Sequence, residues 1–169
     1  MRTRELVLYA ILGAMLAAVQ VALAVLPNIE LVSALIIACT LLLGLRALYP
    51  VYVFVLLEGL LYGFGAWFVC YLYVWAALVL LTWALRRALF GALSWALLCG
   101  MFGLVFGALC ALPYLFVGGW PAALAYWVSG IPFDLLHGAG NTLACALLLR
   151  PCTRVLRAGF TAYGVACKE

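Results

Sequence analysis

The residues best suited to chemistry lie in one short stretch near the end of the chain, Gly130 to Asn141. It contains the only histidine of the protein, His137, together with Asp134 and Asn141. Spacings of three and four residues place these side chains on one face of a helix. A carboxylate, an imidazole and an amide on one face can bind a polar ligand or stabilise a neighbouring helix. Both interpretations need a partner or a water-filled cavity, because polar groups in an apolar segment are costly without one.

The composition indicates that a membrane surrounds this stretch. Hydrophobic residues make up 71% of the 169 residues and charged residues 8%, whereas soluble domains carry about 25% charged residues. We therefore expect an all-α integral membrane protein with a single transmembrane domain, residues 1–169. The first apolar run follows a basic N-terminus, as in a signal peptide, but it is about 20 residues long and lacks a clear cleavage site. We expect it to be retained as the first span.

Six apolar segments are long enough, or nearly so, to cross the hydrocarbon core as helices. The expected helices cover about residues 5–26, 30–45, 50–65, 71–85, 94–116 and 132–149. Pro27 should end the first helix, Asn28 should cap the second, and Pro132 should begin the last. Glu30 would lie in the first turn of the second helix. A connection with a short amphipathic segment, residues 117–130, should precede the last helix.

The nine basic residues predict the orientation. With six spans they all fall on one side, which the positive-inside rule marks as cytoplasmic. They are Arg2, Arg4, Arg46, Arg86, Arg87, Arg150, Arg154, Arg157 and Lys168. Both termini are therefore expected in the cytoplasm.

Polar residues within the apolar segments gather at the opposite, external end. Glu58 is the most informative, because a carboxylate inside a membrane is costly unless it is paired, protonated or solvated. Asp134 and Glu30 have another explanation, since a carboxylate in a first turn complements the helix dipole. His137 could pack between helices. Together with Gln20, however, these residues favour a solvated pocket that opens to the outside.

Aromatic residues accompany the polar ones. Tyr and Trp normally form a belt at the membrane interface, and the alternative here is a stacking surface for a flat ligand. Acids and amides would suit the ring nitrogens or the cationic group of such a heterocycle. The candidate substrate-binding residues are Asn28, Glu30, Glu58, Tyr62, Trp67, Tyr71, Trp75, Trp127, Asp134, His137 and Asn141.

The first span carries a stripe of small residues. Ala10, Ala14, Ala18 and Ala22 recur every four positions. Such a stripe lets another helix approach closely. That helix could belong to the same chain or to a partner subunit, and in the second case Ala10, Ala14 and Ala18 are the candidate docking residues.

Several familiar motifs are missing from the sequence. It contains no phosphate-binding loop, no H-E-x-x-H and no G-x-S-x-G. We expect no enzymatic activity, no cofactor, no metal and no nucleic-acid partner, so energy for concentrating a solute must come from a partner or an ion gradient. The seven cysteines include no C-x-x-C pair, and we interpret the five that lie in apolar segments as small core residues rather than as disulfide partners or metal ligands.

These features resemble the substrate-binding membrane subunits, or S components, of energy-coupling factor (ECF) vitamin transporters. The alanine stripe is similar to the A-x-x-x-A docking signature, and the segments Leu26–Ser33 and Gly130–His137 look like stretches that recur in one branch of the family. The resemblance implies a multi-pass protein of the bacterial plasma membrane. Its partners would be a transmembrane coupling subunit and two ATPase subunits, and its ligand a small water-soluble vitamin or related heterocycle.

Two other classes stay open. A stand-alone ion-coupled carrier of small solutes would use Glu58 or Asp134 as a proton relay. An intramembrane enzyme would need His137 beside a nucleophile such as Ser129, and nothing in the sequence positions that pair.

Overall fold

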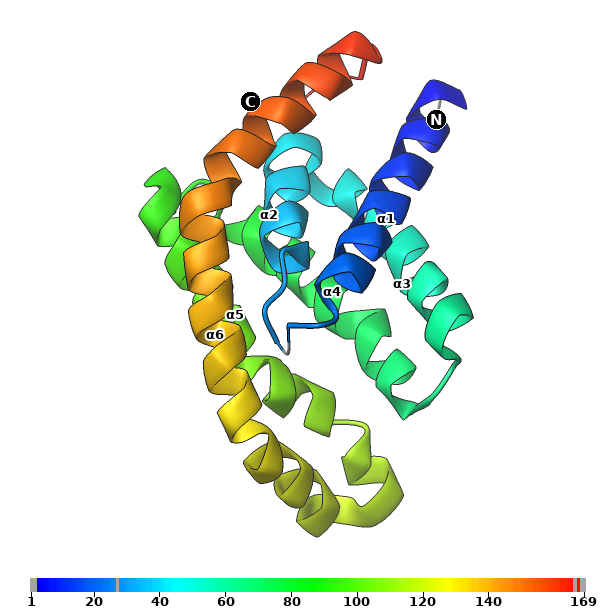
Figure 1. Ribbon diagram of the computed structural model, residues 1–169, viewed down its shortest axis with the longest axis vertical. Helices are drawn as coiled ribbons and strands as arrows, with labels where there is room; N and C mark the ends of the chain where they lie inside the picture. Colours follow the sequence, from blue (N-terminus) through cyan, green and yellow to red (C-terminus); the bar gives the residue numbers. More distant parts are fainter. Residues whose placement is uncertain (1–2, 27, 166, 168–169) are drawn as a thin grey trace.

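The computed structural model describes residues 3–26, 28–165 and 167, and its regular structure is helical throughout. The helices are α1 (Thr3–Leu23), α2 (Val32–Leu43), α3 (Leu48–Tyr62), α4 (Ala66–Leu85), α5 (Gly91–Ala111) and α6 (Tyr114–Ala162). A short 3₁₀ helix, η1 (Gly44–Ala47), joins α2 to α3 (Figure 1). The described residues contain no strand, so the expected all-α class is confirmed.

The described chain has four helical segments that are long and apolar enough to cross a membrane. They are Thr3–Leu23, the run Val32–Tyr62, Ala66–Leu85 and Gly91–Ala111. The run Val32–Tyr62 turns back on itself at η1, so α2 and α3 lie as two helices in different directions (Figure 1). The membrane character of the chain follows from these segments, while six spans and their orientation stay a prediction.

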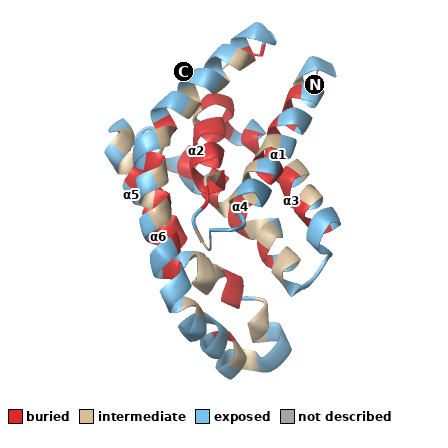
Figure 2. Cartoon of the chain, viewed as in Figure 1, coloured by how far each residue is buried: buried red, intermediate tan, exposed pale blue. Residues whose placement is uncertain are grey.

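The core of the molecule is built around α2. This helix is apolar on every side, and all of its residues except Leu41 are buried. In Figure 2, α2 is coloured as buried over nearly its whole length, whereas the buried residues of α1 lie on one face only. With 12 residues, α2 is about 18 Å long, shorter than the roughly 30 Å hydrocarbon core. It is therefore a central packing element, in contact with α4 and α6.

The connection between α1 and α2 differs from the prediction in how it caps α2. The helix begins after Leu31, which makes no capping bond, and Asn28 adopts a left-handed backbone conformation (φ 56°) four positions before it. The Glu30 carboxylate instead accepts a hydrogen bond from the backbone N–H of Ser33 at 3.2 Å. The expectation that Asn28 caps this helix was wrong, because Glu30 satisfies that amide. The expected stop at Pro27 lies outside the described residues, and α1 ends at Leu23.

The last helix departs furthest from the prediction. We expected a connection over residues 117–130 and a helix from Pro132 to Leu149, but α6 runs from Tyr114 to Ala162. The backbone is non-helical at Gly118 and Gly119, so a kink there divides α6 into two helical pieces, and glycine permits the positive φ of 67° at Gly119. A proline removes one helical hydrogen bond, and a tightly packed neighbour can keep such a helix continuous. Here α5 packs along α6 and is that neighbour.

The extension of α6 past Leu149 also has a local cause. Cys152 and Leu156 are half-buried and Phe160 is buried, at a spacing of four residues. This spacing continues an apolar stripe along the helix, so the helix keeps packing where the sequence becomes basic. The other helix boundaries shift by at most five residues from those expected, and the end at Leu85 is as expected.

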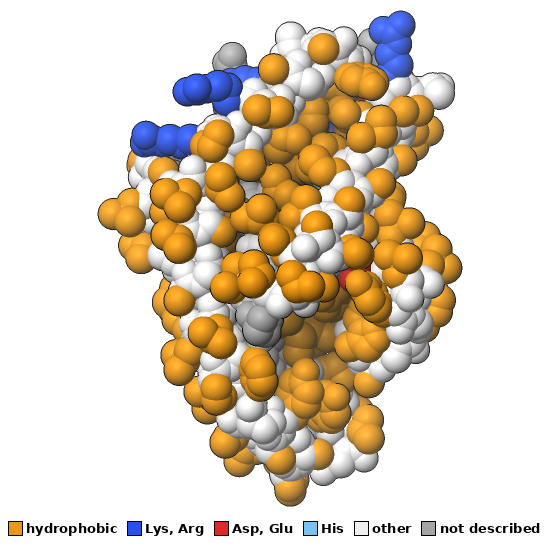
Figure 3. Space-filling model, in the orientation of Figure 1, with side chains coloured by type: hydrophobic (Ala, Val, Ile, Leu, Met, Phe, Trp, Pro, Cys, Tyr) orange, Lys and Arg blue, Asp and Glu red, His pale blue; other side chains and the backbone are white. Residues whose placement is uncertain are grey.

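Both ends of the described chain lie at the same end of the molecule (Figure 1). Figure 3 shows basic side chains gathered there, on a surface that is otherwise dominated by hydrophobic side chains. Two of the nine basic residues used in the orientation argument, Arg2 and Lys168, lie outside the described residues. The basic side chains visible on this face therefore lie at one end of the molecule, in agreement with their one-sided distribution in the sequence.

Candidate functional site

A cavity of about 220 Å³ lies where the end of α1 and the following connection meet α4, α5 and α6. Its lining residues are Gln20, Leu23, Ala24, Leu26, Asn28, Ile29, Glu30, Tyr71, Trp75, Phe106 and His137. We call it the principal cavity. It is smaller than the roughly 300–1,000 Å³ of pockets for drug-sized ligands, so it fits a small compound.

A buried polar network forms one wall of the principal cavity. His137 Nε2 lies 3.2 Å from Glu30 Oε1, and the Ser33 hydroxyl also donates to that carboxylate. Asn141 Nδ2 donates to Ser33 Oγ at 3.2 Å. All four residues are buried, and they join α6 to the beginning of α2. The network thereby holds the carboxylate of Glu30 and the imidazole of His137 in fixed positions.

This arrangement leaves the network able to accept further contacts. A carboxylate offers about four acceptor positions on its two oxygens. In Glu30, Oε1 is bonded to His137 and Ser33, and Oε2 accepts only from the Ser33 amide. A ligand with N–H or O–H groups would therefore find acceptors that are already positioned.

Aromatic side chains form the opposite wall. The Phe106 ring lies edge-on to His137, with 4.8 Å between ring centroids. Trp75 lies 5.5 Å from Phe106 and 5.5 Å from Tyr71, the second pair in a perpendicular arrangement. Such edge-to-face contacts hold rings rigidly and leave faces available for stacking. Trp75 is 1% exposed and its indole N–H has no described partner, so it can donate to a bound ligand.

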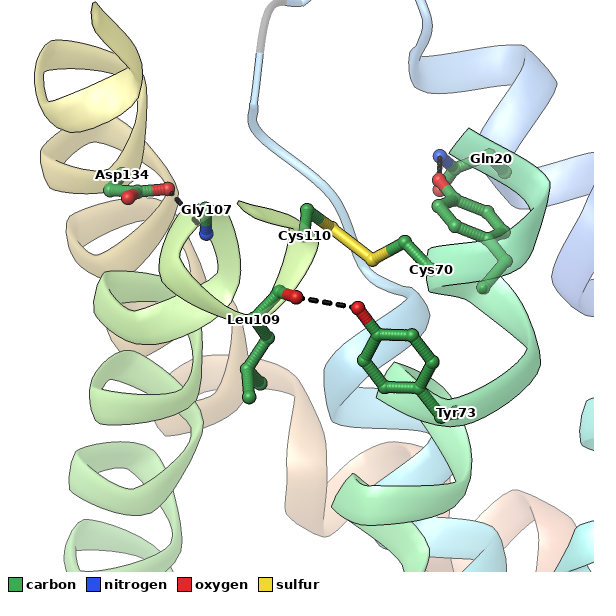
Figure 4. The surroundings of a disulfide bond; sticks show 8 residues. Gln20, Cys70, Tyr73, Gly107, Leu109, Cys110 and Asp134 are labelled. Atoms are coloured by element: carbon green, nitrogen blue, oxygen red, sulfur yellow. Dashed lines mark hydrogen bonds between the residues drawn. A yellow bond between two sulfur atoms is a disulfide. The ribbon is translucent and has the colours of Figure 1, made fainter. Parts of the chain in front are cut away.

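A second cavity of about 320 Å³ adjoins the first. It is lined by Gln20, Ala24, Glu58, Tyr62, Trp67 and Tyr71. Gln20, Ala24 and Tyr71 line both cavities, and Gln20 Nε2 donates to the Tyr71 hydroxyl at 3.4 Å (Figure 4). This contact forms the partition between the two spaces. We call the second space the Glu58 cavity.

Unpaired acceptors face a wall of aromatic rings in the Glu58 cavity. Glu58 is 3% exposed, and its Oε1 atom has no hydrogen-bond partner among the described residues. The same is true of Gln20 Oε1. A buried acceptor without a partner is costly, and a carboxylate especially so. A cation that carries N–H groups would satisfy these acceptors, and the rings would favour it further.

Three of the predicted site residues lie away from both cavities. Asp134 accepts a hydrogen bond from the backbone N–H of Gly107 at 2.9 Å, which joins α6 to α5 (Figure 4). Asn141 lies behind the cavity wall, bonded to Ser33. Trp127 is 41% exposed on the surface of α6. Of the residues that line the cavities, Asn28, Glu30, Glu58, Tyr62, Trp67, Tyr71, Trp75 and His137 were on the predicted list.

Sequence reasoning missed Phe106 and Ser33. Phe106 lies in an apolar run in which nothing distinguishes it from neighbouring phenylalanines, so no local signal could have found it. Ser33 carried a signal, because it is a polar residue three positions after Glu30 at the start of an apolar run. That spacing permits the side chain to bond back to the residue before the helix.

The cysteines require a correction. Cys70, near the beginning of α4, forms a disulfide with Cys110, at the end of α5 (Figure 4). We had interpreted both as small core residues, like the other cysteines in apolar segments, because the sequence contains no C-x-x-C pair. These two are 40 positions apart, and only the antiparallel packing of α4 and α5 brings them together. The described residues contain no cluster of potential metal ligands.

The pair needed for an intramembrane nucleophile does not form. The Ser129 hydroxyl is exposed and donates to the Tyr126 carbonyl. His137 instead contacts Glu30 and Phe106. The geometry therefore offers no nucleophile–base contact between these two residues.

The alanine stripe lies on the surface. Ala10, Ala14 and Ala18 are exposed, whereas the adjacent Ala17 is buried. The packing against α3 uses Gly13, where an added Cβ would lie 2.8 Å from the Pro50 carbonyl oxygen. A groove of about 490 Å³ follows the stripe between α1 and α3. It is lined by Ala14, Ala17, Ala18, Val21, Ala22, Leu57, Leu60 and Leu61. We call it the alanine groove.

Comparisons with protein-family models, with curated proteins and with solved structures find no match for this chain.

Proposed function

We propose that this protein is the substrate-binding membrane subunit of an uptake system for a small water-soluble heterocycle, such as a vitamin. The protein binds the compound, and a separate module with a coupling subunit and two ATPases drives its import. In this proposal the chain crosses a bacterial plasma membrane six times, with both termini in the cytoplasm.

The observation that carries the proposal is the principal cavity. It combines a fixed carboxylate–imidazole pair, Glu30 and His137, with the rings of Tyr71, Trp75 and Phe106. A concavity in which several polar side chains converge beside aromatic rings is typical of ligand sites. The lining comes from the end of α1 that lies away from the N-terminus. With the basic end in the cytoplasm, this cavity lies toward the outside, where an uptake system meets its substrate.

The lining supports a ligand with a flat ring and several hydrogen-bond donors. Glu30 and Glu58 are acceptors when ionised, and Gln20 Oε1 adds a third. The heterocycle would stack in the principal cavity against Phe106 or Trp75. A cationic or amino group on the same ligand would extend toward Glu58, past the contact between Gln20 and Tyr71.

The alanine groove supports a partner helix. The exposed alanines of α1 are not needed for packing within the chain, because α3 already packs on the adjacent face of α1. A partner helix could approach the backbone of α1 closely along this row. The coupling subunit is the proposed occupant.

The experiment that tests the proposed ligand class is a thermal-unfolding screen of the full chain in detergent. Vitamins and other heterocycles are added singly, because a ligand that binds only the folded state raises its stability by RT ln(1 + [L]/Kd). At a concentration of 100 Kd, the gain is about 2.7 kcal/mol. A screen in which no planar cationic or donor-rich heterocycle stabilises the protein would contradict the proposal.

The Glu58 cavity provides the matched variants for the ligand found. Glu58→Gln keeps the shape and removes the charge, and it should weaken binding of a cationic ligand by about 10- to 150-fold, as expected for loss of a charged hydrogen bond. Glu5→Gln removes a carboxylate at the other end of α1 and is the control, with affinity unchanged. Equal affinity in both variants would place the ligand in the principal cavity alone.

The ion-coupled alternative has one observation in its favour. Glu58 Oε1 and Asp134 Oδ2 are buried without partners among the described residues, as a proton-carrying carboxylate would be. Uptake by vesicles that contain only this chain, driven by a proton gradient, would support that alternative. Uptake that requires ATP and the ATPase subunits would exclude it.

A further inference from the structure

A concave surface that the proposed function does not use lies between the beginning of α5 and the last third of α6. Its volume is about 440 Å³. It is lined by Leu41, Gly91, Ala92, Trp95, Leu149, Arg150, Thr153, Arg154 and Arg157. We call it the arginine groove. One side of it is apolar and the other is cationic.

The cationic side consists of Arg150, Arg154 and Arg157. Their spacing of four and three residues places them on one face of α6. All three are exposed, and none belongs to an ion pair among the described residues. None of the described acidic residues lines the groove. Because like charges at this spacing repel one another, a bound anion would stabilise this face.

The beginning of α5 adds hydrogen-bond donors to the same groove. This helix starts at Gly91, and the preceding residue, Phe90, supplies no side-chain cap. The first amides of a helix have no intrahelical acceptor, and they form the positive end of its dipole. Gly91 and Ala92 both line the groove, so this helix end and the arginines face one space. Anion oxygens are suitable acceptors for such amides.

The apolar side distinguishes an amphiphile from a free anion. Trp95 and Leu149 are buried beneath the groove, and Leu41 is half-buried beside them. An inorganic phosphate would use the cationic side only. A phospholipid would place its headgroup at the arginines and the start of its acyl chains against these three side chains. Basic pockets between membrane helices on the cytoplasmic side bind acidic lipid headgroups in this way.

We propose that the arginine groove binds the headgroup phosphate of an acidic phospholipid. This inference is independent of the proposed uptake function, because no residue of the groove lines either ligand cavity. The groove lies on the basic part of α6, toward the end of the molecule where both ends of the chain lie (Figure 1). Acidic phospholipid in the facing leaflet is the partner whose charge complements it.

Native mass spectrometry of the full chain in a neutral detergent tests the proposal. The protein is titrated with phosphatidylglycerol, phosphatidylcholine or inorganic phosphate, and the bound fraction gives an apparent affinity. Each basic residue near an anionic lipid surface contributes roughly fivefold. The triple variant R150Q/R154Q/R157Q should therefore bind phosphatidylglycerol about a hundredfold more weakly than wild type.

The matched control is R4Q/R86Q/R87Q, which removes the same charge outside the groove. It should retain the wild-type affinity within about threefold. If the first triple variant does not fold, R154Q is compared with R87Q, with an expected loss of roughly fivefold for R154Q alone. Equal losses in groove and control variants, or equal binding of the two lipids by wild type, would overturn the proposal. If an equal concentration of inorganic phosphate displaced phosphatidylglycerol, the groove would bind free phosphate rather than a lipid headgroup, and the proposal would be overturned.

Discussion

His137 Nε2 lies 3.2 Å from Glu30 Oε1, although 107 positions separate the two residues. The contact joins the middle of α6 to the residues that precede α2, and it forms part of the wall of the principal cavity. The same two residues therefore connect the helices and line the principal cavity. Both residues are buried, which makes the contact sensitive to loss of either partner.

A double-mutant cycle should reveal strong coupling between these residues. We expect Glu30→Gln and His137→Asn each to lower the free energy of unfolding, with an interaction energy of about 1–3 kcal/mol between them. The physical reason is that Glu30→Gln removes the carboxylate that strengthens the hydrogen bond, and His137→Asn removes the imidazole that reaches it. Reversible unfolding in mixed micelles, followed by circular dichroism, measures the four free energies.

The more solvent-accessible pair Arg46 and Glu5, 3.3 Å apart, is the control for that cycle. Solvent-exposed ion pairs contribute about 0.2–1 kcal/mol. An interaction energy for Glu30 and His137 no larger than that of the control pair would mean that their contact is incidental.

Glycines at the contact of α5 with α6 should be intolerant of substitution. A Cβ at Gly103 would lie 2.9 Å from the backbone of Gly138, closer than real Cβ atoms approach. We expect Gly103→Ala to destabilise the protein by about 1–3 kcal/mol, because the two helices must separate. The separation would also displace His137, so ligand affinity should fall together with stability.

Gly159 provides the matched control, since it lies in α6 with open space around its Cα. Gly159→Ala should be neutral or stabilising by up to about 1 kcal/mol, because alanine favours the helix. Thermal unfolding of the two variants side by side measures the difference. Similar values for both would show that α5 and α6 pack less closely than described.

The features that could be predicted from the sequence depend on local patterns. The helical class follows from composition, and the polar cluster follows from the cost of groups such as Glu58 in apolar segments. The same reasoning selected Glu30 and His137, which line the principal cavity. These residues were predictable because each is unusual for its own surroundings.

The features that could not be predicted depend on contacts between distant segments. Asp134 pairs with a backbone amide of α5, and no sequence pattern identifies which amide a carboxylate will contact. The pairing of Cys70 with Cys110 requires the arrangement of α4 and α5. Helix α6 continues through Pro132 because its neighbours hold it, whereas the local preference of proline predicts a helix start.

The disulfide between Cys70 and Cys110 should be detectable and stabilising. Peptide mapping without reduction should find these two cysteines linked. Cys70→Ser should lower the free energy of unfolding by about 2–4 kcal/mol, because the bond restricts the unfolded chain between α4 and α5. Cys152→Ser changes a free, half-buried cysteine and should have a much smaller effect. Equal effects of the two substitutions, or a mapped pairing of other cysteines, would contradict this prediction.

The alanine groove should be required for assembly and not for ligand binding. Ala14 and Ala18 are exposed on α1, and a tryptophan at either position would fill the space that a partner helix needs. If the proposed coupling subunit and ATPases are its partners, we expect Ala14→Trp to weaken association with them by at least about tenfold, or 1.4 kcal/mol. Affinity of the isolated protein for its ligand should stay unchanged, since Ala14 lines neither ligand cavity.

Leu147→Trp, at an exposed position on α6, adds the same bulk elsewhere and should leave both properties intact. Copurification with the identified ATPase subunits, together with uptake in cells, measures the effect. Normal assembly and uptake by the Ala14 variant would mean that the groove faces lipid alone.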